Sequence, residues 1–102
     1  MGKTAYDWWS YALRVLHKYP DLAKRDPASL SGREKRELAA VNTLLEELKS
    51  DPERLAIVQL RHFRDSHSLA GVAQKLHRCY NTVSTWNTEI IKRLGVLLGL
   101  EE

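Results

Sequence analysis

The sequence predicts an all-α protein of about five helices. Apolar residues recur at steps of three and four along most of its 102 residues, and no useful stretch alternates between apolar and polar residues as a half-buried strand would. Hydrophobic residues make up 43% of the chain and charged residues 28%, which supplies enough apolar material for one small core. The three prolines, at positions 20, 27 and 52, punctuate the helical patterns.

The first helix is expected to end before Pro20. Trp9, Leu13 and Leu16 lie three or four residues apart and mark its apolar face. Proline disfavours helical backbone at the residue that precedes it, so the helix should not pass this point. The polar, turn-rich stretch 21–30 then reads as a connector.

Capping signals open the second and third helices. Ser31 followed by Glu34 fits a capping box, and a helix of about five turns should follow and end near Ser50. Asp51-Pro52 then starts a third helix, because proline in the first helical position lacks only an N–H that would be unpaired there. The third helix should stop around Asp65.

The last two helices are predicted on either side of a short break, His77-Arg78-Cys79. Ser68 is placed to cap the fourth helix, and the fifth should run from Tyr80 to Leu98. The apolar residues of the fifth helix, at helical spacing, are Val83, Trp86, Ile90 and Leu94. These signals divide the chain into an N-terminal helical part, residues 1–50, and a second part, residues 51–102.

Composition and motifs argue against several protein classes. No apolar run approaches the roughly 20 residues of a membrane-spanning helix, and the start lacks a secretory pattern, so a cytoplasmic location is expected. The single cysteine cannot form an internal disulfide. The four histidines form no HxxxH or HExxH pair, and neither a phosphate loop nor a nucleophile elbow is present. We therefore expect no enzyme, no metal ion and no cofactor.

The net charge of +3 is unevenly distributed along the chain. Residues 1–51 carry nine Lys/Arg and eight Asp/Glu, for a net charge of +1. Residues 54–93 carry seven Lys/Arg and only two Asp/Glu, for a net charge of +5. A polyanionic partner should therefore meet the later stretch.

Residues 68–94 have the spacing of a helix-turn-helix, in which the second helix enters the major groove of DNA. Ala73 is small where the two helices would cross closely, and Leu76 would close the first helix onto the core. Val83, preceded by Thr82, would pack back from the second helix. An ordinary helical hairpin is the alternative interpretation.

The start of the fifth helix would present short polar side chains outward if its apolar stripe faces the core. Asn81 is the best single candidate for a base contact, because its amide can pair bidentately with adenine; helix capping is its alternative role. The full set of candidate base-contacting residues is Tyr80, Asn81, Ser84, Thr85 and Thr88. The candidate phosphate-contacting residues are Arg64, Lys75, Arg78 and Lys92, each with solvated surface charge as the alternative.

The three tryptophans are expected to play different parts. Trp86 belongs to the inward stripe and should be a core residue rather than a base-stacking group. Of the adjacent pair, Trp8 and Trp9, one should pack against the second helix and the other should face a partner, since two neighbours cannot share one narrow helix face.

The second half of the chain contains two sets of short motifs. The first is Asp51-Pro52-Glu53-Arg54-Leu55, Val58, Leu60-Arg61, Phe63, Ser68-Leu69, Val72-Ala73, Leu76 and Thr82-Val83. This set resembles region 4 of the sigma-70 factors, which contacts promoter DNA and the core RNA polymerase. The second is Ser66-His67-Ser68-Leu69, Lys75-Leu76-His77, Cys79-Tyr80-Asn81-Thr82 and Trp86. It is similar to the stretch by which RinA-type phage transcriptional activators are identified.

Two positions differ from the usual sigma pattern. His77 and Arg78 occupy the turn, where glycine and an aliphatic residue are usual, so His77 must adopt the geometry that glycine would supply. Cys79 stands where a serine usually caps the recognition helix. Because a thiol is a weaker acceptor than a hydroxyl, we expect a weaker cap here.

The resemblance implies a small helical domain with a C-terminal helix-turn-helix like that of sigma-70 region 4. It further implies a phage-encoded, sequence-specific DNA-binding regulator that activates late or structural gene transcription in the cytoplasm of a bacterial host. Double-stranded DNA would be its partner, with host RNA polymerase and a second copy of the chain as further candidates.

Two alternatives remain open at this point. One is a helical protein-interaction module without DNA binding, which would contact polymerase or a phage protein through the N-terminal tryptophans and an acidic cluster. That cluster comprises Glu46, Glu47, Asp51 and Glu53, whose simpler role is to solvate the helix break. The other alternative is a small DNA-recognition subunit of a phage packaging machine.

Overall fold

The computed structural model describes residues 8–100, and every regular element in this part of the chain is helical. Five of these elements are α-helices, as the sequence predicts: α1 (Trp9–Lys24), α2 (Gly32–Leu48), α3 (Pro52–Ile57), α4 (Leu69–Leu76) and α5 (Tyr80–Leu97). A 3-10 turn, η1 (Pro27–Ser29), lies between α1 and α2, and a π-helical segment, η2 (Val58–Phe63), continues α3.

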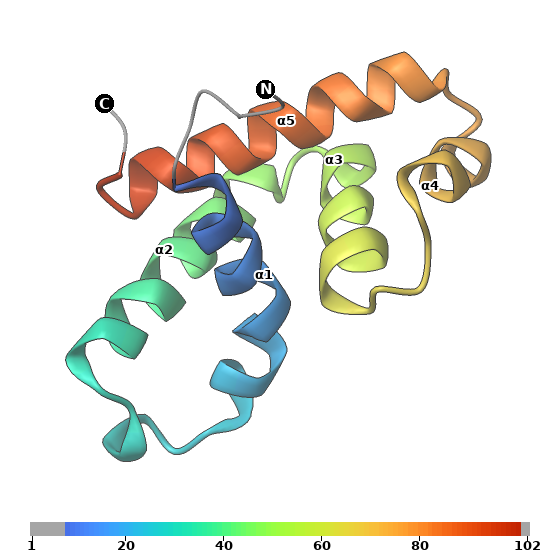
Figure 1. The fold of residues 1–102 in the computed structure, drawn as a ribbon. Coiled ribbons are helices and arrows are strands. Elements are labelled where there is room, and N and C mark those ends of the chain that lie inside the picture. Colours follow the sequence, from blue (N-terminus) through green and yellow to red (C-terminus); the bar gives the residue numbers. More distant parts are fainter. Residues whose placement is uncertain (1–7, 101–102) are drawn as a thin grey trace.

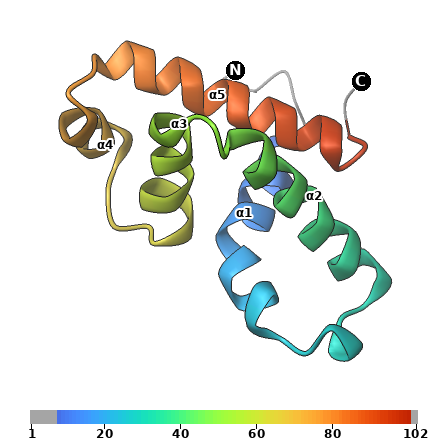
Figure 2. The same ribbon diagram turned by 180° about the vertical axis from the view of Figure 1, so that it is seen from behind.

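The long helix α5 runs along one side of the molecule, and the other helices pack beneath it (Figure 1). The α1–α2 pair lies under its C-terminal half, whereas α3 and α4 lie under its N-terminal half, as the reverse view also shows (Figure 2). Each of these four helices contacts α5. One continuous hydrophobic cluster, which includes Leu16, Val41, Ile57 and Leu94, joins them.

The predicted inward stripe of α5 is largely buried. Val83, Ile90 and Leu94 are at most 2% exposed, and each contributes about 1.5–3 kcal/mol through removal of its side chain from water. Trp86 is only half-buried, although it packs against the same cluster.

Helix α1 does not end before Pro20 but continues to Lys24, so the boundary predicted from the proline is wrong. A proline inside a helix costs about 3 kcal/mol. Two tertiary interactions offset that cost. The Tyr19 ring stacks on Phe63 at 5.0 Å, and Leu22 in the last turn is 2% exposed. The expected connector is correspondingly shorter, because its first four residues, 21–24, belong to α1.

The capping signals correctly predict where three helices begin. Ser31 and Glu34 form a complete capping box, with N–H to side-chain oxygen distances of 3.1 and 3.0 Å. Asp51 accepts from the backbone N–H of Arg54 at 3.2 Å, and Ser68 caps α4 in the same way. The predicted ends of α2 and α5 are within two residues of the observed ones.

The expectation that one tryptophan of the adjacent pair is exposed to a partner is wrong. Trp8 and Trp9 are both half-buried and packed against the core, so neither presents a fully exposed ring to a partner. Trp8 packs closely on α5: a Cβ at Gly95 would lie 2.6 Å from its ring. Gly95 therefore permits a close approach between the start of α1 and α5 that any larger residue would prevent.

One histidine is buried in the core where three elements meet. His62 of η2 is 2% exposed, its Nε2 lies 2.8 Å from Asn87 Oδ1 on α5, and its Nδ1 lies 3.4 Å from His17 Nε2 on α1. Burial lowers the pKa of His62 to about 4, although the hydrogen bond to Asn87 acts in the opposite direction. The ring is therefore neutral at pH 7, where its Nε2–H donates to Asn87.

We predict that His62 makes the fold sensitive to acid between pH 6.5 and 4. In this interval the unfolded chain binds a proton at His62 and the folded chain does not, so stability falls as the pH falls. The full shift in the pKa of His62 corresponds to about 3 kcal/mol of stability.

The free energy of unfolding, measured by urea titration at a series of pH values, should fall by this much more in the wild type than in His62→Gln. His67→Gln, in the loop before α4, is the control and should follow the wild type. Parallel curves for the wild type and His62→Gln would contradict the assignment, as would a ring pKa above 6.5 for His62 by NMR.

Candidate nucleic-acid interface

The first turns of α5 form a polar end of the molecule that other elements leave open. Tyr80 is 52% exposed, Asn81 and Thr85 are exposed, and Ser84 is half-buried. Only α3 and α4 pack near this end, on the underside of α5, while α1 and α2 lie under its other half (Figure 1). The candidate base-contacting residues therefore lie in one region of the surface, with Thr88, also exposed, one turn further along.

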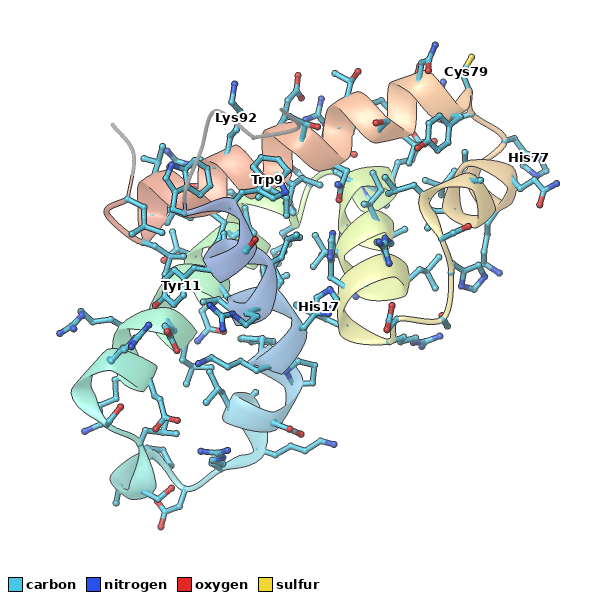
Figure 3. All side chains as sticks on the ribbon, viewed as in Figure 1. Trp9, Tyr11, His17, His77, Cys79 and Lys92 are labelled. Atoms are coloured by element: carbon cyan, nitrogen blue, oxygen red, sulfur yellow. The ribbon has the colours of Figure 1, made fainter. Side chains whose placement is uncertain are left out.

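A tight turn joins α4 to α5 and sets the direction in which α5 leaves α4. His77 adopts left-handed backbone, with φ 57° and ψ 44°. Its N–H donates to Gln74 O, and the N–H of Arg78 donates to Ala73 O at 3.0 Å, which is the hydrogen-bond pattern of a Schellman motif. His77 and Cys79 extend from the tip of the molecule (Figure 3). The Cys79 side chain makes no capping hydrogen bond, in agreement with the expected weak cap.

Arg78 is held by a carboxylate within the protein. Its Nε and a terminal nitrogen each lie 2.9 Å from an oxygen of Glu53, at the start of α3. This bidentate contact raises the pKa of Arg78 above its usual value. A phosphate contact by Arg78 would therefore have to replace Glu53.

Two arginines lie close to the Trp86 ring. The guanidinium of Arg54 is 5.1 Å from the ring centroid and that of Arg78 is 5.9 Å away, both within the range of cation–π attraction. Arg54 is itself paired with Glu89 at 2.6 Å. The ring is occupied by these contacts and by the core, which agrees with its predicted packing role rather than with base stacking.

The acidic cluster does more than solvate the helix break. Glu47 on α2 forms a bidentate pair with Arg93 on α5, at 2.8 and 2.6 Å. The hydrogen bond from Arg93 holds the pKa of Glu47 below its usual range. Glu53 pairs with Arg78, and Asp51 caps α3 and contacts Arg54. The expectation of simple solvation is therefore wrong for these three acids, which bind arginines of the chain itself.

These pairs reduce the free positive charge of residues 54–93. The four arginines Arg54, Arg61, Arg78 and Arg93 each form an ion pair. Arg64 and Lys75 form none with any residue in the range 8–100. Both candidate phosphate contacts therefore have charge available without rearrangement, and of the two Lys75 is the one that lies on α4 beside the turn. Lys92 is half-buried on the far half of α5, away from the turn.

Sequence reasoning missed Glu53 as the partner of Arg78. No local pattern connects the two residues, which lie 25 positions apart. The sequence also gave no sign that Glu37 on α2 is buried.

The described residues offer neither a metal site nor a membrane-spanning helix. No group of three or more His, Cys, Asp or Glu side chains within residues 8–100 is close enough to hold a metal ion. None of the described helices combines the length and the apolar character needed to cross a bilayer. Comparison with protein-family models, curated proteins and solved structures gave no match to this chain.

We predict that His77→Gly stabilises the protein by about 1 kcal/mol, because glycine adopts left-handed backbone without the steric penalty of a Cβ. The free energy of unfolding by urea at pH 7 measures the effect. Lys75→Gly, which places a glycine inside α4, is the matched control and should destabilise the protein by about 1 kcal/mol. Equal destabilisation by both substitutions would show that His77 carries no backbone strain.

Proposed function

We propose that this protein is a sequence-specific DNA-binding transcription regulator that places the N-terminal turns of α5 in the major groove. The observation that carries the proposal is the exposed row of short hydrogen-bonding side chains at the open end of α5. A helix of about 10–12 Å diameter fits a major groove about 12 Å wide. The short α4, the tight turn and the longer α5 supply the connectivity of a helix-turn-helix.

In this proposal the side chains divide into two groups. Asn81 reads a base edge, with adenine as the best match to its amide, and Tyr80, Ser84, Thr85 and Thr88 contact neighbouring bases or the backbone. Lys75 neutralises a phosphate beside the turn, and Arg64 and Lys92 would do so further away. Arg78 contributes only after exchanging Glu53 for a phosphate oxygen.

The short motifs between Ser66 and Trp86 that resemble those of RinA-type activators suggest a more specific form of this proposal. The protein would be a phage-encoded activator of late or structural genes that works with the host RNA polymerase in the bacterial cytoplasm. It would have no catalytic activity of its own. A second copy of the chain would supply a second half-site contact, since one small recognition helix buries limited surface on DNA.

Salt-dependent binding to duplex DNA tests the proposal. Lys75→Ala should weaken binding to every duplex. It should also make the decrease of log affinity with log salt less steep, by about 0.9 in slope, the effect of one lost phosphate contact. Asn81→Ala should instead lower discrimination at one base pair, by about 1–3 kcal/mol, as measured with sequences selected from a random pool. Lys24→Ala, at the far end of α1, is the matched control and should change neither quantity.

The alternative function is a helical protein-interaction module. The pairing of four arginines with carboxylates favours it, because it leaves less free positive charge for a polyanion than the sequence suggests. Binding to random duplex that does not fall with salt, together with unchanged affinity in Lys75→Ala and Asn81→Ala, would exclude the DNA-binding proposal and favour this module.

A further inference from the structure

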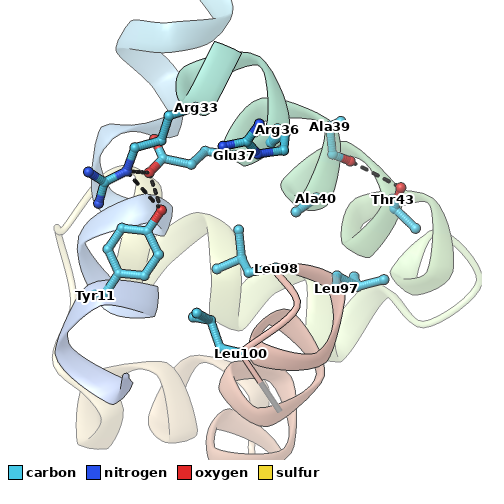
Figure 4. Close-up of a pocket in the computed structure, with 10 residues that line it drawn as sticks. All are labelled: Tyr11, Arg33, Arg36, Glu37, Ala39, Ala40, Thr43, Leu97, Leu98 and Leu100. Carbon is cyan, nitrogen blue, oxygen red and sulfur yellow. Dashed lines mark hydrogen bonds and ion pairs between the residues drawn. The ribbon is translucent and has the colours of Figure 1, made fainter. Parts of the chain in front are cut away.

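A groove at the opposite end of the molecule from the α4–α5 turn combines an apolar floor with a basic rim. It lies between α2 and the chain that follows α5, has a volume of about 440 Å³, and is bordered on one side by Tyr11 of α1 (Figure 4). Its size is that of a site for a few side chains rather than for a folded domain.

Leucines from the end of α5 and the turn after it form the floor of this groove. Leu98 and Leu100 lie side by side between Tyr11 and α2 (Figure 4), and Leu100 is 38% exposed. Gly99 has a positive φ of 78°, and the N–H of Leu100 donates to Gly95 O at 2.8 Å, so a Schellman motif fixes the backbone here. The exposed leucine is therefore held on the surface by the fold.

The side of the groove that α2 forms needs no hydrogen bond from a bound segment. Ala39 and Ala40 supply methyl groups, and the Thr43 hydroxyl donates to Ala39 O at 3.0 Å. The hydroxyl is thus satisfied within the helix, and an aliphatic side chain can lie against this wall without leaving a buried donor unpaired.

Two arginines of α2, Arg33 and Arg36, give the rim a net positive charge. Glu37, between them on the groove lining, is 1% exposed and accepts from the Tyr11 hydroxyl. Its Oε1 also lies 2.9 Å from Lys18 Nζ, a charge contact outside hydrogen-bond geometry. Burial raises the pKa of Glu37, but the Tyr11 and Lys18 contacts outweigh it and the pKa lies below its usual value.

Arg33 is partly engaged within the protein. Its Nε lies 3.4 Å from Glu37 and 3.5 Å from the Tyr11 hydroxyl, and its guanidinium lies 5.0 Å from the centroid of the Tyr11 ring. Arg36 forms no ion pair with any residue in the described range. Arginine binds carboxylates through two parallel hydrogen bonds, so Arg36 can bind an acidic side chain placed at the end of the groove, with the positive charge of Arg33 beside it.

We propose that this groove docks a short segment of a partner protein in which aliphatic and acidic residues lie close together. One or two aliphatic side chains would rest on Leu98 and Leu100, and a carboxylate would bind Arg36 with Arg33 beside it. Charge complementarity selects an acidic segment over a basic one. The leucine floor selects a peptide over nucleic acid, because a phosphate backbone gains nothing from contact with exposed leucines. The proposal is independent of DNA binding by α5.

Selection from a phage-displayed library of random peptides on the full-length protein tests this inference. We expect enriched peptides that combine Asp or Glu with Leu, Ile or Val. A synthesised representative should bind at least about tenfold more weakly to Arg36→Glu, the loss that removal of a charge-assisted hydrogen bond causes. Leu100→Asp should weaken it to a similar degree. Lys35→Glu, the same charge change at the neighbouring exposed residue outside the groove, should leave binding within about threefold.

Three results would overturn the proposal: no enrichment, enriched peptides without carboxylates, or equal losses in Arg36→Glu and Lys35→Glu. A fourth is loss of duplex DNA binding in Arg36→Glu with peptide binding intact, which would make the groove a nucleic-acid surface. Because Arg36 and Leu100 are exposed, circular dichroism should confirm that these variants remain folded.

Discussion

The packing of α5 against two separate pairs of elements is the constraint on which the rest of the structure depends. Its C-terminal half is buried against α1 and α2, and its N-terminal half lies on α3 and α4. Two arginine–carboxylate pairs reinforce this arrangement: Arg93–Glu47 joins α5 to α2, and Arg54–Glu89 joins α5 to α3. Because α1 and α2 occupy one half of the helix, the first turns of the other half stay accessible, with their polar side chains on the surface.

How much of this could be predicted depended on the range of the interactions involved. The starts of α2, α3 and α4 follow from side chains that cap the backbone within a few positions, and the sequence displays such residues directly. The end of α1 could not be predicted in this way. Tyr19 and Leu22 hold the helix together around Pro20 through partners that only the fold brings near. The approach of Trp8 to Gly95 is hidden for the same reason.

The ion pairs also depend on residues that are far apart in the sequence, so they too could not be predicted from it. The net charge of +5 over residues 54–93 is correct as a count, but it does not show which charges remain free. Arg54 pairs with Glu89, Arg78 with Glu53 and Arg93 with Glu47, and these carboxylates lie 35, 25 and 46 positions away. Only their positions in the fold reveal that Lys75 stays available while Arg78 is engaged. The exposure of Asn81 and Thr85, by contrast, follows from helical periodicity and could be expected from the sequence.

Two proposed binding surfaces lie at opposite ends of α5, and the central claim is that the first turns of α5 bind DNA. Backbone amide NMR shifts, recorded while random-sequence duplex DNA is added at low salt, test that claim most directly. The account predicts that the largest changes fall on residues 75–88, at the turn and the first turns of α5, with little change along α1 and α2. Changes confined to α1 and α2, or none at any residue, would contradict it.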